Sequence, residues 1–557
     1  MSRIACTTVI LLTATTALAQ NIQPRIGEPV DGLNDQQNAF FFEGRQEFRR
    51  LMSMEPGLGP GFNNTSCVGC HNVPTTGGSS QIIVTRIGRL DENGYSDLVE
   101  FGGPVLQELG IPEKCNDSFP LKANAVSSRR TPALFGLGLV EAVDDQTLID
   151  LAESQTGTIS GRVNMGFAIE DGPDAEPRVG RFGFKAAVPT LTHFSADATL
   201  NEMGLTNRFF PMDNAPSGDP ELLMFCDDAP DPEMTPDDNG RDFVDKITIY
   251  QRLLAAPPQT PREGMRGEEL FVQVGCAECH VPELRTSDDP KLEPALRDRT
   301  IKPYSDFLLH DMGENGEGLL QQGLAAGEEM RTTPLWGIRR RAALWHDGRS
   351  SGNSLEEQLL TPVIGAIDLH NAPGSEAAPS AQAFRALSDQ DQLDVVRFLD
   401  SLGRAEFDST GDNSVDDADL ESFQECFTGP GEFYTPDDPC AVHDFDLDGD
   451  VDNDDLAAFA RAFDPPQPDC DGNGVSDFDQ IIAGGDANGD FILDVCQGLP
   501  GCPGDCDANG LVDFEDLLCT LLLFGDDAQR DPADCDGDGV VNFSDLVCAL
   551  ARFGPCE

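Results

Sequence analysis

Two short runs of the chain combine a pair of cysteines with a histidine at fixed spacing. Residues 67–71 and 276–280 both have the pattern Cys-x-x-Cys-His. Two thiols one turn apart can form thioethers with the two vinyl groups of a haem, and the adjacent histidine can then bind the iron. A zinc site would need both cysteine pairs at one metal, yet the pairs lie 209 residues apart and each ends in its own histidine. An ordinary disulfide is the other alternative. The sequence predicts two covalent c-type haems, held by Cys67, Cys70 and His71 and by Cys276, Cys279 and His280.

Carboxylates recur at calcium-loop spacing in the C-terminal part of the chain. The run from Asp444 to Asp455 has oxygen donors at loop positions 1, 3, 5, 9 and 12 and Gly449 at position 6. This is the EF-hand pattern, with Asp in place of the usual final Glu. The frame recurs at 408–419, without the glycine, and at 505–516 and 534–545, with degenerate versions at 469–480 and 486–494. The predicted calcium ligands are Asp408, Asp412, Asp416, Asp419, Asp444, Asp446, Asp448, Asp452, Asp455, Asp505, Asp507, Asn509, Asp513, Asp516, Asp534, Asp536, Asp538, Asn542 and Asp545.

The loops that begin at Asp505 and Asp534 lie 29 residues apart and resemble a dockerin-type module, as does the pair at 408 and 444. Dockerins bind cohesin partners, so the resemblance implies a cohesin-like or surface partner for this tail. A disordered acidic tail is the alternative interpretation.

These groups must be carried by elements that the hydrophobic pattern predicts to be mostly helical. Residues 146–152 and 388–402 have helical periodicity, and long strand-like alternation is scarce. The expected fold class is mainly α, with two cytochrome-c-like haem domains followed by small α-helical calcium-loop modules. The expected boundaries are a signal peptide at 1–19, haem domains at 20–255 and 256–404, EF-hand or dockerin-like repeats at 405–465, and cysteine-rich dockerin-like calcium-loop repeats at 466–557.

The net charge of the 557-residue chain is −61, and it is unevenly distributed. Residues 405–557 have 39 acidic side chains against three arginines and contribute −36, whereas the rest contributes −25. Nucleic-acid binding needs clustered basic side chains, so this composition excludes it as the main activity. Much of the acidity belongs to the predicted calcium loops.

The first residues have the features of a secretory signal peptide. An arginine precedes an apolar stretch that ends in Ala-Leu-Ala, which predicts cleavage after Ala19. No later stretch has the ~18 uncharged apolar residues that a membrane span needs. We therefore expect an exported protein of the periplasm, cell surface or extracellular space, in which Cys115 and Cys226 pair as a disulfide.

The order of motifs resembles that of a bacterial family. R-T-P-A-L-F-G at 130–136, G-R-F-G-F-K at 180–185 and N-E-M-G at 201–204 follow the first Cys-x-x-Cys-His. L-L-H-D-M-G at 308–313, P-L-W-G at 334–337 and W-H-D-G-R at 345–349 follow the second. This order resembles the bacterial di-haem oxidoreductases of peroxidase-like type, relatives of the di-haem cytochrome c peroxidases and of the di-haem enzyme that matures the tryptophan tryptophylquinone cofactor. The resemblance covers residues 32–404 and implies one haem that relays electrons and one that meets peroxide. R-T-T-P-L-W-G at 331–337 repeats the earlier R-T-P run, which indicates an internal duplication.

The resemblance also offers distal residues. Met203 is the candidate sixth ligand of the first haem, with core packing as the alternative. Residues 72–92 contain no histidine, where related peroxidases have a distal one. The segment 354–363 resembles the peroxidase segment with the distal glutamate, so our hypothesis is that the second haem is peroxidatic and that Glu357 moves a proton between the peroxide oxygens. An exposed helix glutamate is the alternative for Glu357.

Several histidines, tryptophans and arginines complete the candidate set. His346 is the second catalytic candidate, and His346 and His310 could also contact haem propionates, order the pocket or bind iron. His370 is a candidate ligand or a surface histidine, and His193 is expected to be structural. The two tryptophans, Trp336 and Trp345, either pack in the core or relay electrons. Propionates need cationic partners, which the following cluster could supply: Arg331, Arg339, Arg340, Arg341 and Arg349.

Together these features predict an exported di-haem c-type oxidoreductase, an enzyme of peroxidase-like type with a calcium-binding interaction or anchoring tail. Its expected partner is a redox protein that donates electrons or is itself oxidised. The alternative is a non-catalytic di-haem electron-transfer cytochrome displayed at the cell surface. An enzyme needs an iron with an exchangeable distal position, and a carrier does not.

Overall fold

The computed structural model describes residues 21–54, 57–227, 235–341, 343–351, 357–431, 433–464, 467–470, 473–486, 491–496, 511–512, 514–522, 524, 535, 540–551 and 553–555. The predicted signal peptide lies outside these residues. The chain separates into two compact units, of which the larger comprises Gln23–Glu406 with Thr435–Pro439. The smaller comprises Phe407–Tyr434 and the chain from Cys440 onward, together with the N-terminal residues up to Ile22. No helix in the described ranges is long and apolar enough to cross a membrane.

Several helices of the larger unit begin at polar caps. Asn34 and Asp242 each form a capping box at the start of a helix, and Thr190 caps a third through the N–H of His193. The described helices are α1 (Asp35–Arg49), α2 (Cys67–Cys70), α3 (Leu137–Glu141), α4 (Asp145–Ser154), α5 (Leu191–Met203), α6 (Pro220–Cys226), α7 (Phe243–Leu253), α8 (Arg266–Gln273), α9 (Glu357–His370), α10 (Ala378–Arg385) and α11 (Asp389–Ser401).

The expectation of a mainly α fold is corrected by the strands. The fold is mixed, with 37% helix and 13% strand. Most strands are pairs of two or three residues, and the longest, β2, pairs antiparallel with both β3 and β5. The strands are β1 (Gly61–Phe62), β2 (Ile83–Asp91), β3 (Gly94–Ser96), β4 (Leu109–Gly110), β5 (Ala125–Arg130), β6 (Asn164–Gly166), β7 (Arg178–Gly180), β8 (Leu284–Arg285), β9 (Thr300–Ile301), β10 (Leu309–Asp311), β11 (Glu329–Arg331), β12 (Ala343–Leu344), β13 (Ser350–Ser351), β14 (Leu511–Val512) and β15 (Gly554–Pro555).

The sequence pattern does not reveal β5 as a strand, because most of its buried positions are polar. In β5 the buried side chains of the alternating face are Ala125, Ser127 and Arg129. An apolar alternation is therefore missing, although the burial alternates as in any half-buried strand. The two-residue strands are too short to show a period at all.

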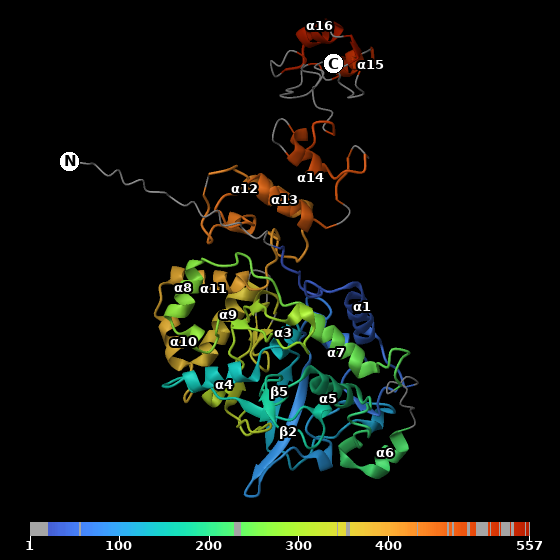
Figure 1. Cartoon of the computed structure of the whole chain (residues 1–557), viewed down its shortest axis with the longest axis vertical. Helices are drawn as coiled ribbons and strands as arrows, with labels where there is room; N and C mark the ends of the chain where they lie inside the picture. Colours follow the sequence, from blue (N-terminus) through green and yellow to red (C-terminus); the bar gives the residue numbers. More distant parts are fainter. Residues whose placement is uncertain are drawn as a thin grey trace, which may run out of the picture. The chain divides into compact units, whose positions relative to one another are not determined.

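The two largest hydrophobic cores among the described residues of the larger unit each lie beside one Cys-x-x-Cys-His motif. The first draws on α1, α3, α5 and α7, and Cys67 and Val68 pack against it. The second draws on α8, α9 and α11, and Cys276 and Ala277 pack against it. Figure 1 shows this division, with α1, α5 and α7 gathered on one side of the unit and α8–α11 on the other. Each motif therefore has its own helical framework.

The smaller unit contains α12 (Asp417–Cys426), α13 (Asn453–Ala462), α14 (Asp477–Gln480), α15 (Phe514–Leu522) and α16 (Phe543–Ala551). Asp416 and Asp452 begin α12 and α13 with capping boxes that Asp419 and Asp455 complete. Positions 9 and 12 of the two predicted calcium loops thus start the helices that follow. Aromatic side chains dominate the core, including Phe407, Phe423, Phe459 and Phe478.

Candidate haem centres

The first motif forms its own helical turn. In α2 the side chain of Ser66 accepts the N–H of Gly69, and the turn ends at His71. The Nδ1 atom of His71 lies 3.1 Å from the carbonyl oxygen of Gly78, and burial lowers the pKa of His71 to about 4. A neutral ring that donates its Nδ1–H to a carbonyl keeps Nε2 as a metal ligand.

The second motif repeats this arrangement. Cys276–Glu278 forms the short 3-10 helix η6, and the Nδ1 atom of His280 lies 2.8 Å from the carbonyl oxygen of Tyr304. Burial lowers the pKa of His280 to about 4. The two predicted proximal histidines therefore resemble each other, since each is a buried neutral ring whose Nδ1 lies on a backbone carbonyl.

A shared hydrogen-bond pattern supports the internal duplication. The residue after each carbonyl is a serine, Ser79 or Ser305, and its hydroxyl donates to the carbonyl of a threonine. The acceptors, Thr131 and Thr332, belong to the two R-T-P-like runs, and both donor–acceptor distances are 2.7 Å. Sequence reading paired the threonines but missed the serines, because Ser79 lies 8 residues after its histidine and Ser305 lies 25 after its own.

The thiols of both motifs are free, whereas the other cysteines whose side chains the structure describes form disulfides. Of the cysteines whose side chains the structure describes, the four motif cysteines are unpaired. The others form Cys115–Cys226, as predicted, and Cys426–Cys440, Cys470–Cys496 and Cys535–Cys548. Burial raises the pKa of Cys67 and Cys276 to about 12. A covalently held haem needs two free thiols next to a neutral histidine. The residues of both motifs therefore fit a covalently attached haem.

A cavity of about 240 Å³ lies beside the second motif. Side chains from both halves of the larger unit line it, and most of them are apolar. The polar and ionisable members are Arg130, Cys276, Cys279, His280, His310, Arg331, Thr332, Thr333, Arg341, His346, His370, Glu376 and Ser380. A mainly apolar cavity with a few convergent polar groups is the usual form of a cofactor site.

In the described part of the chain, three guanidinium groups of this cavity form no ion pair with a carboxylate. Burial lowers the pKa of Arg130 and Arg331 to about 10 and that of Arg341 to about 9. Their partners within the described residues are hydroxyl and carbonyl oxygens of Ser79, Ser80, Gly183, Thr332, Pro334 and Trp336. The Nε atoms of Arg130 and Arg341 are buried without any acceptor. Such cations call for an anion in the cavity, which haem propionates would provide.

The structure reduces the number of predicted arginines that could bind a propionate in this cavity. Arg331 and Arg341 line the cavity, whereas Arg339 pairs with Asp400 and Arg349 with Asp347. Arg340 lies in the 3-10 helix η9 (Ile338–Arg340) and does not line the cavity. Sequence reading missed Arg130, which lies on β5 in the first half. Its position before Thr131 matches that of Arg331 before Thr332, and this match was the available signal.

His310 has both ring nitrogens engaged by carboxylates. Nε2 lies 2.9 Å from Asp306 and Nδ1 lies 3.1 Å from Glu376. Burial alone would lower the pKa of His310, but hydrogen bonds to Asp306 and other neighbours raise it to about 12. A histidine held as a cation between two carboxylates orders the pocket and has no nitrogen left for iron.

The structure places His346 at the cavity, but it does not describe the side chain of Glu357. His346 is 6% exposed and lines it, burial lowers its pKa, and no hydrogen bond to its ring occurs among the described residues. Glu357 is the first residue of α9, and the structure describes its backbone and not its side chain. It lies 13 residues before His370, or about 20 Å along an ideal helix. The residues of α9 that line the cavity lie from Val363 onward.

The remaining predicted residues are placed as follows. The sulfur of Met203, at the end of α5, lies 3.8 Å from Cys67 Sγ, so the structure brings Met203 to the first motif. The neighbouring Glu202, which sequence reading did not single out, is half-buried, and desolvation raises the pKa of its carboxyl. His193 interacts with the carbonyl oxygen of Phe167, away from the cavity. Trp336 is buried in the first core, whereas Trp345 lines the cavity.

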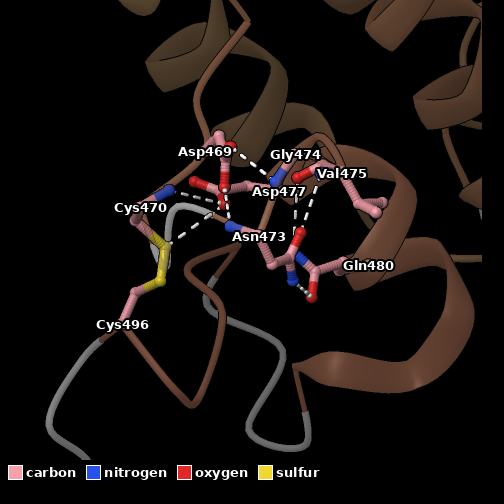
Figure 2. The surroundings of a disulfide bond; sticks show 8 residues. All are labelled: Asp469, Cys470, Asn473, Gly474, Val475, Asp477, Gln480 and Cys496. Atoms are coloured by element: carbon pink, nitrogen blue, oxygen red, sulfur yellow. Dashed lines mark hydrogen bonds between the residues drawn. A yellow bond between two sulfur atoms is a disulfide. The ribbon is translucent and has the colours of Figure 1, made fainter.

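The acidic loops share one backbone geometry. Asp408, Asp444 and Asp469 stand at loop position 1, and each accepts a backbone N–H from position 5 or 6 or from both. Figure 2 shows the degenerate loop, in which Asp469 accepts the N–H groups of Asn473 and Gly474 beside the Cys470–Cys496 disulfide. The chain thus bends around a carboxylate at the start of each loop.

The loop that begins at Asp444 brings several carboxylates close together. Oxygens of Asp444, Asp446 and Asp455 lie within 4.8 Å of one another. Burial, then neighbouring carboxylates, raises the pKa of Asp444 to about 6. The pKa of Asp455 is raised to about 7, chiefly by burial. Among the other predicted ligands, Asp505, Asp507, Asn509, Asp513, Asp534, Asp536 and Asp538 lie outside the described residues, and the side chain of Asp516 is not described.

Comparison with known proteins identifies the family. Residues 120–402 match the family model described as "Di-haem oxidoreductase, putative peroxidase". No curated protein matches the chain. A MauG-like protein associated with microbial copper homeostasis is similar at 16% identity and a TM-score of 0.29, over 70% of this chain and 95% of that chain. The hydrazine synthase of Kuenenia stuttgartiensis is similar at 15% identity and a TM-score of 0.27, over 72% of this chain and all of that chain. Values this low assign no activity.

The family model spans just over half of the 557 residues. It includes the second Cys-x-x-Cys-His motif, both R-T-P-like runs and every described residue that lines the cavity. The chain therefore belongs to the di-haem oxidoreductase family.

Proposed function

We propose that the protein is an exported di-haem c-type oxidoreductase of peroxidase-like type. Cys67 and Cys70 would hold one haem with His71 as iron ligand, and Cys276, Cys279 and His280 would hold the other. When bound, the haems supply electron relay and peroxide reduction. The observation that carries the proposal is the pair of free thiol sets, each next to a neutral histidine on a carbonyl, in a chain whose other described cysteines form disulfides.

The cavity beside the second motif supplies side chains that would bind the propionates and transfer protons. Arg130, Arg331 and Arg341 would neutralise propionates and fix the orientation of the macrocycle. His346 is a buried neutral base in the same cavity, which is what proton transfer to or from peroxide oxygens requires. The role proposed for Glu357 stands on the sequence alone.

Replacing His346 by Gln is expected to lower kcat/KM for peroxide about 100-fold or more, because general acid–base groups contribute on this scale. Steady-state turnover with a reduced artificial electron donor measures the effect, and Glu357→Gln is assayed in parallel. His193→Gln, remote from the cavity, serves as the matched control and should retain wild-type turnover. Unchanged turnover in His346→Gln excludes His346 as the proton-transfer group, and the same result in Glu357→Gln excludes Glu357.

Export is supported by the disulfides of both units, since such bonds persist in oxidising compartments. The partner is proposed to be a redox protein that donates electrons or is oxidised. A cohesin-like or surface partner for the tail is proposed from the dockerin resemblance.

We also infer that the acidic loops bind calcium. Asp444 Oδ1 and Asp450 Oδ1 are buried and have no hydrogen-bond partner among the described residues, in a loop that gathers several further carboxylates. Hard oxygen donors in this number suit Ca²⁺, which would relieve their mutual repulsion. The cation would therefore stabilise the smaller unit.

Removing calcium with a chelator is expected to lower the melting temperature of the smaller unit in the full chain. A ligand present at 100 times its Kd stabilises a fold by about 2.7 kcal/mol, so the loss is readily measured by calorimetry. Asp444→Asn should reduce the calcium effect, whereas Asp454→Asn, an exposed helix position outside the proposed ligand set, should retain it. Identical melting with and without chelator would contradict the calcium assignment.

A further inference from the structure

The ring of His370 lies close to the ring of the predicted proximal histidine of the second motif. The ring centroids of His280 and His370 are 6.4 Å apart and their planes meet at 62°. Both side chains line the same cavity. A metal bound by two imidazole nitrogens at about 2 Å each separates the ring centroids by about 6 Å. The pair therefore has the spacing of two ligands on opposite sides of one metal ion.

The orientation of both rings is fixed in the same manner. His280 Nδ1 lies 2.8 Å from Tyr304 O, and His370 Nδ1 lies 2.7 Å from Ala366 O. In each ring the Nδ1–H donates to the carbonyl, which leaves Nε2 as the ligand atom. No hydrogen bond to the Nε2 atom of either ring occurs among the described residues.

A tryptophan holds His370 in place. The Trp345 ring meets the His370 ring edge to face, with centroids 5.0 Å apart. Trp345 Nε1 donates to Asn315 O at 3.1 Å, while Asn315 Nδ2 donates to the carbonyl oxygen of Leu369 at 2.7 Å. The φ angle of Trp345 is +77°, a costly conformation for a bulky residue, and such strain is kept where the surroundings demand it. Asn315 thus ties Trp345 to the end of α9 that carries His370.

The other histidines of the cavity do not compete for this position. His310 has both nitrogens on carboxylates. His346 packs near Phe184 and Trp345, and no ring contact with His280 is found for it in the described part of the chain.

We propose that His370 is the second axial ligand of the haem held by Cys276 and Cys279. The inference rests on the proposed function, because it presupposes a haem at the second motif. Two-histidine ligation suits electron relay. While His370 is bound, peroxide has no access to this iron, so any peroxide reaction at the second haem requires the release of His370.

Spectroscopy of the ferric holoprotein with both haems attached tests the proposal without an activity assay. Wild type should show a low-spin signal from a two-histidine haem in its EPR spectrum. His370→Ala should lose that signal and gain a high-spin one, and added imidazole should restore the low-spin signal. His193→Ala, a matched histidine removal outside the cavity, should retain the wild-type spectrum. An unchanged low-spin signal in His370→Ala would overturn the proposal.

A second variant covers the case in which His370→Ala fails to retain its haem. His370→Met keeps an axial donor but exchanges nitrogen for sulfur, which should change the low-spin spectrum and raise the reduction potential of one haem. A His370→Met spectrum and potential identical to wild type would also overturn the proposal. Mass spectrometry separates the two failures. A wild-type protein without haem at residues 276–279 overturns the proposed function, whereas two attached haems with unchanged spectra overturn only the role of His370.

Discussion

Replacing Cys276 and Cys279 by alanine should remove one of the two covalent haems and leave the other attached. Both thioether bonds of one haem depend on these thiols, whereas the first motif has its own helical core and its own fixed histidine. Intact-protein mass and the absorbance of the pyridine haemochrome per chain should both show one haem instead of two. The corresponding variant at Cys67 and Cys70 should lose the other haem, so the pair of variants also assigns each spectral signal to its motif.

A cysteine pair outside the motifs provides the control. Removing the Cys115–Cys226 disulfide by replacing both residues with serine should leave two haems per chain, although the fold will be less stable. Motif variants that still carry two thioether-bound haems would contradict covalent attachment at these cysteines.

Glu317→Ala should destabilise the larger unit by about 3–5 kcal/mol, the usual cost of removing one partner from a buried ion pair. The Glu317 side chain is fully buried and binds Arg129 through both oxygens, at 2.6 and 2.7 Å. Ser127 donates to it at 2.8 Å, and Lys185 Nζ lies 3.5 Å away. The substitution leaves the guanidinium of Arg129 and the Lys185 ammonium without their carboxylate. Chemical denaturation of the holoprotein measures the loss.

Glu314→Ala, an exposed glutamate three residues away, should change stability by no more than about 0.5 kcal/mol and serves as the matched control. The effect should also depend on pH. Burial alone would raise the pKa of Glu317, but Arg129 and Lys185 hold it at about 2. Its stabilising contribution is therefore complete above the unfolded-state pKa of about 4.5 and is lost as the pH falls towards 2. Equal stabilities of wild type and Glu317→Ala at pH 7 would contradict this account.

The parts of the site that lie within short sequence runs could be predicted. A Cys-x-x-Cys-His run determines its own geometry, because the thiols and the histidine share one turn. The carboxylates of each predicted calcium loop likewise lie in one short run, and the structure shows that the position-9 aspartates Asp416 and Asp452 also cap α12 and α13. The Cys115–Cys226 disulfide followed from counting cysteines in an exported chain.

The parts that depend on distant segments could not be predicted. Arg130 reaches the cavity of the second motif from β5 in the first half. Tyr304 fixes His280 through a backbone carbonyl, for which side-chain identity gives no signal. His370 is 90 residues from His280 and meets it only because α9 packs against the second core. The mixed fold was missed for a similar reason, because polar side chains of β5 are buried against partners such as Glu317.

Titration of the fully ferric holoprotein with hydrogen peroxide, followed by optical and EPR spectroscopy, tests the central claim most directly. A peroxidase-like di-haem oxidoreductase should change the spectrum of at least one haem at stoichiometric peroxide and return to its resting spectrum when a reduced electron donor is added. Two strictly low-spin, six-coordinate haems that stay unchanged by peroxide in both redox states would contradict the account and identify a di-haem electron carrier.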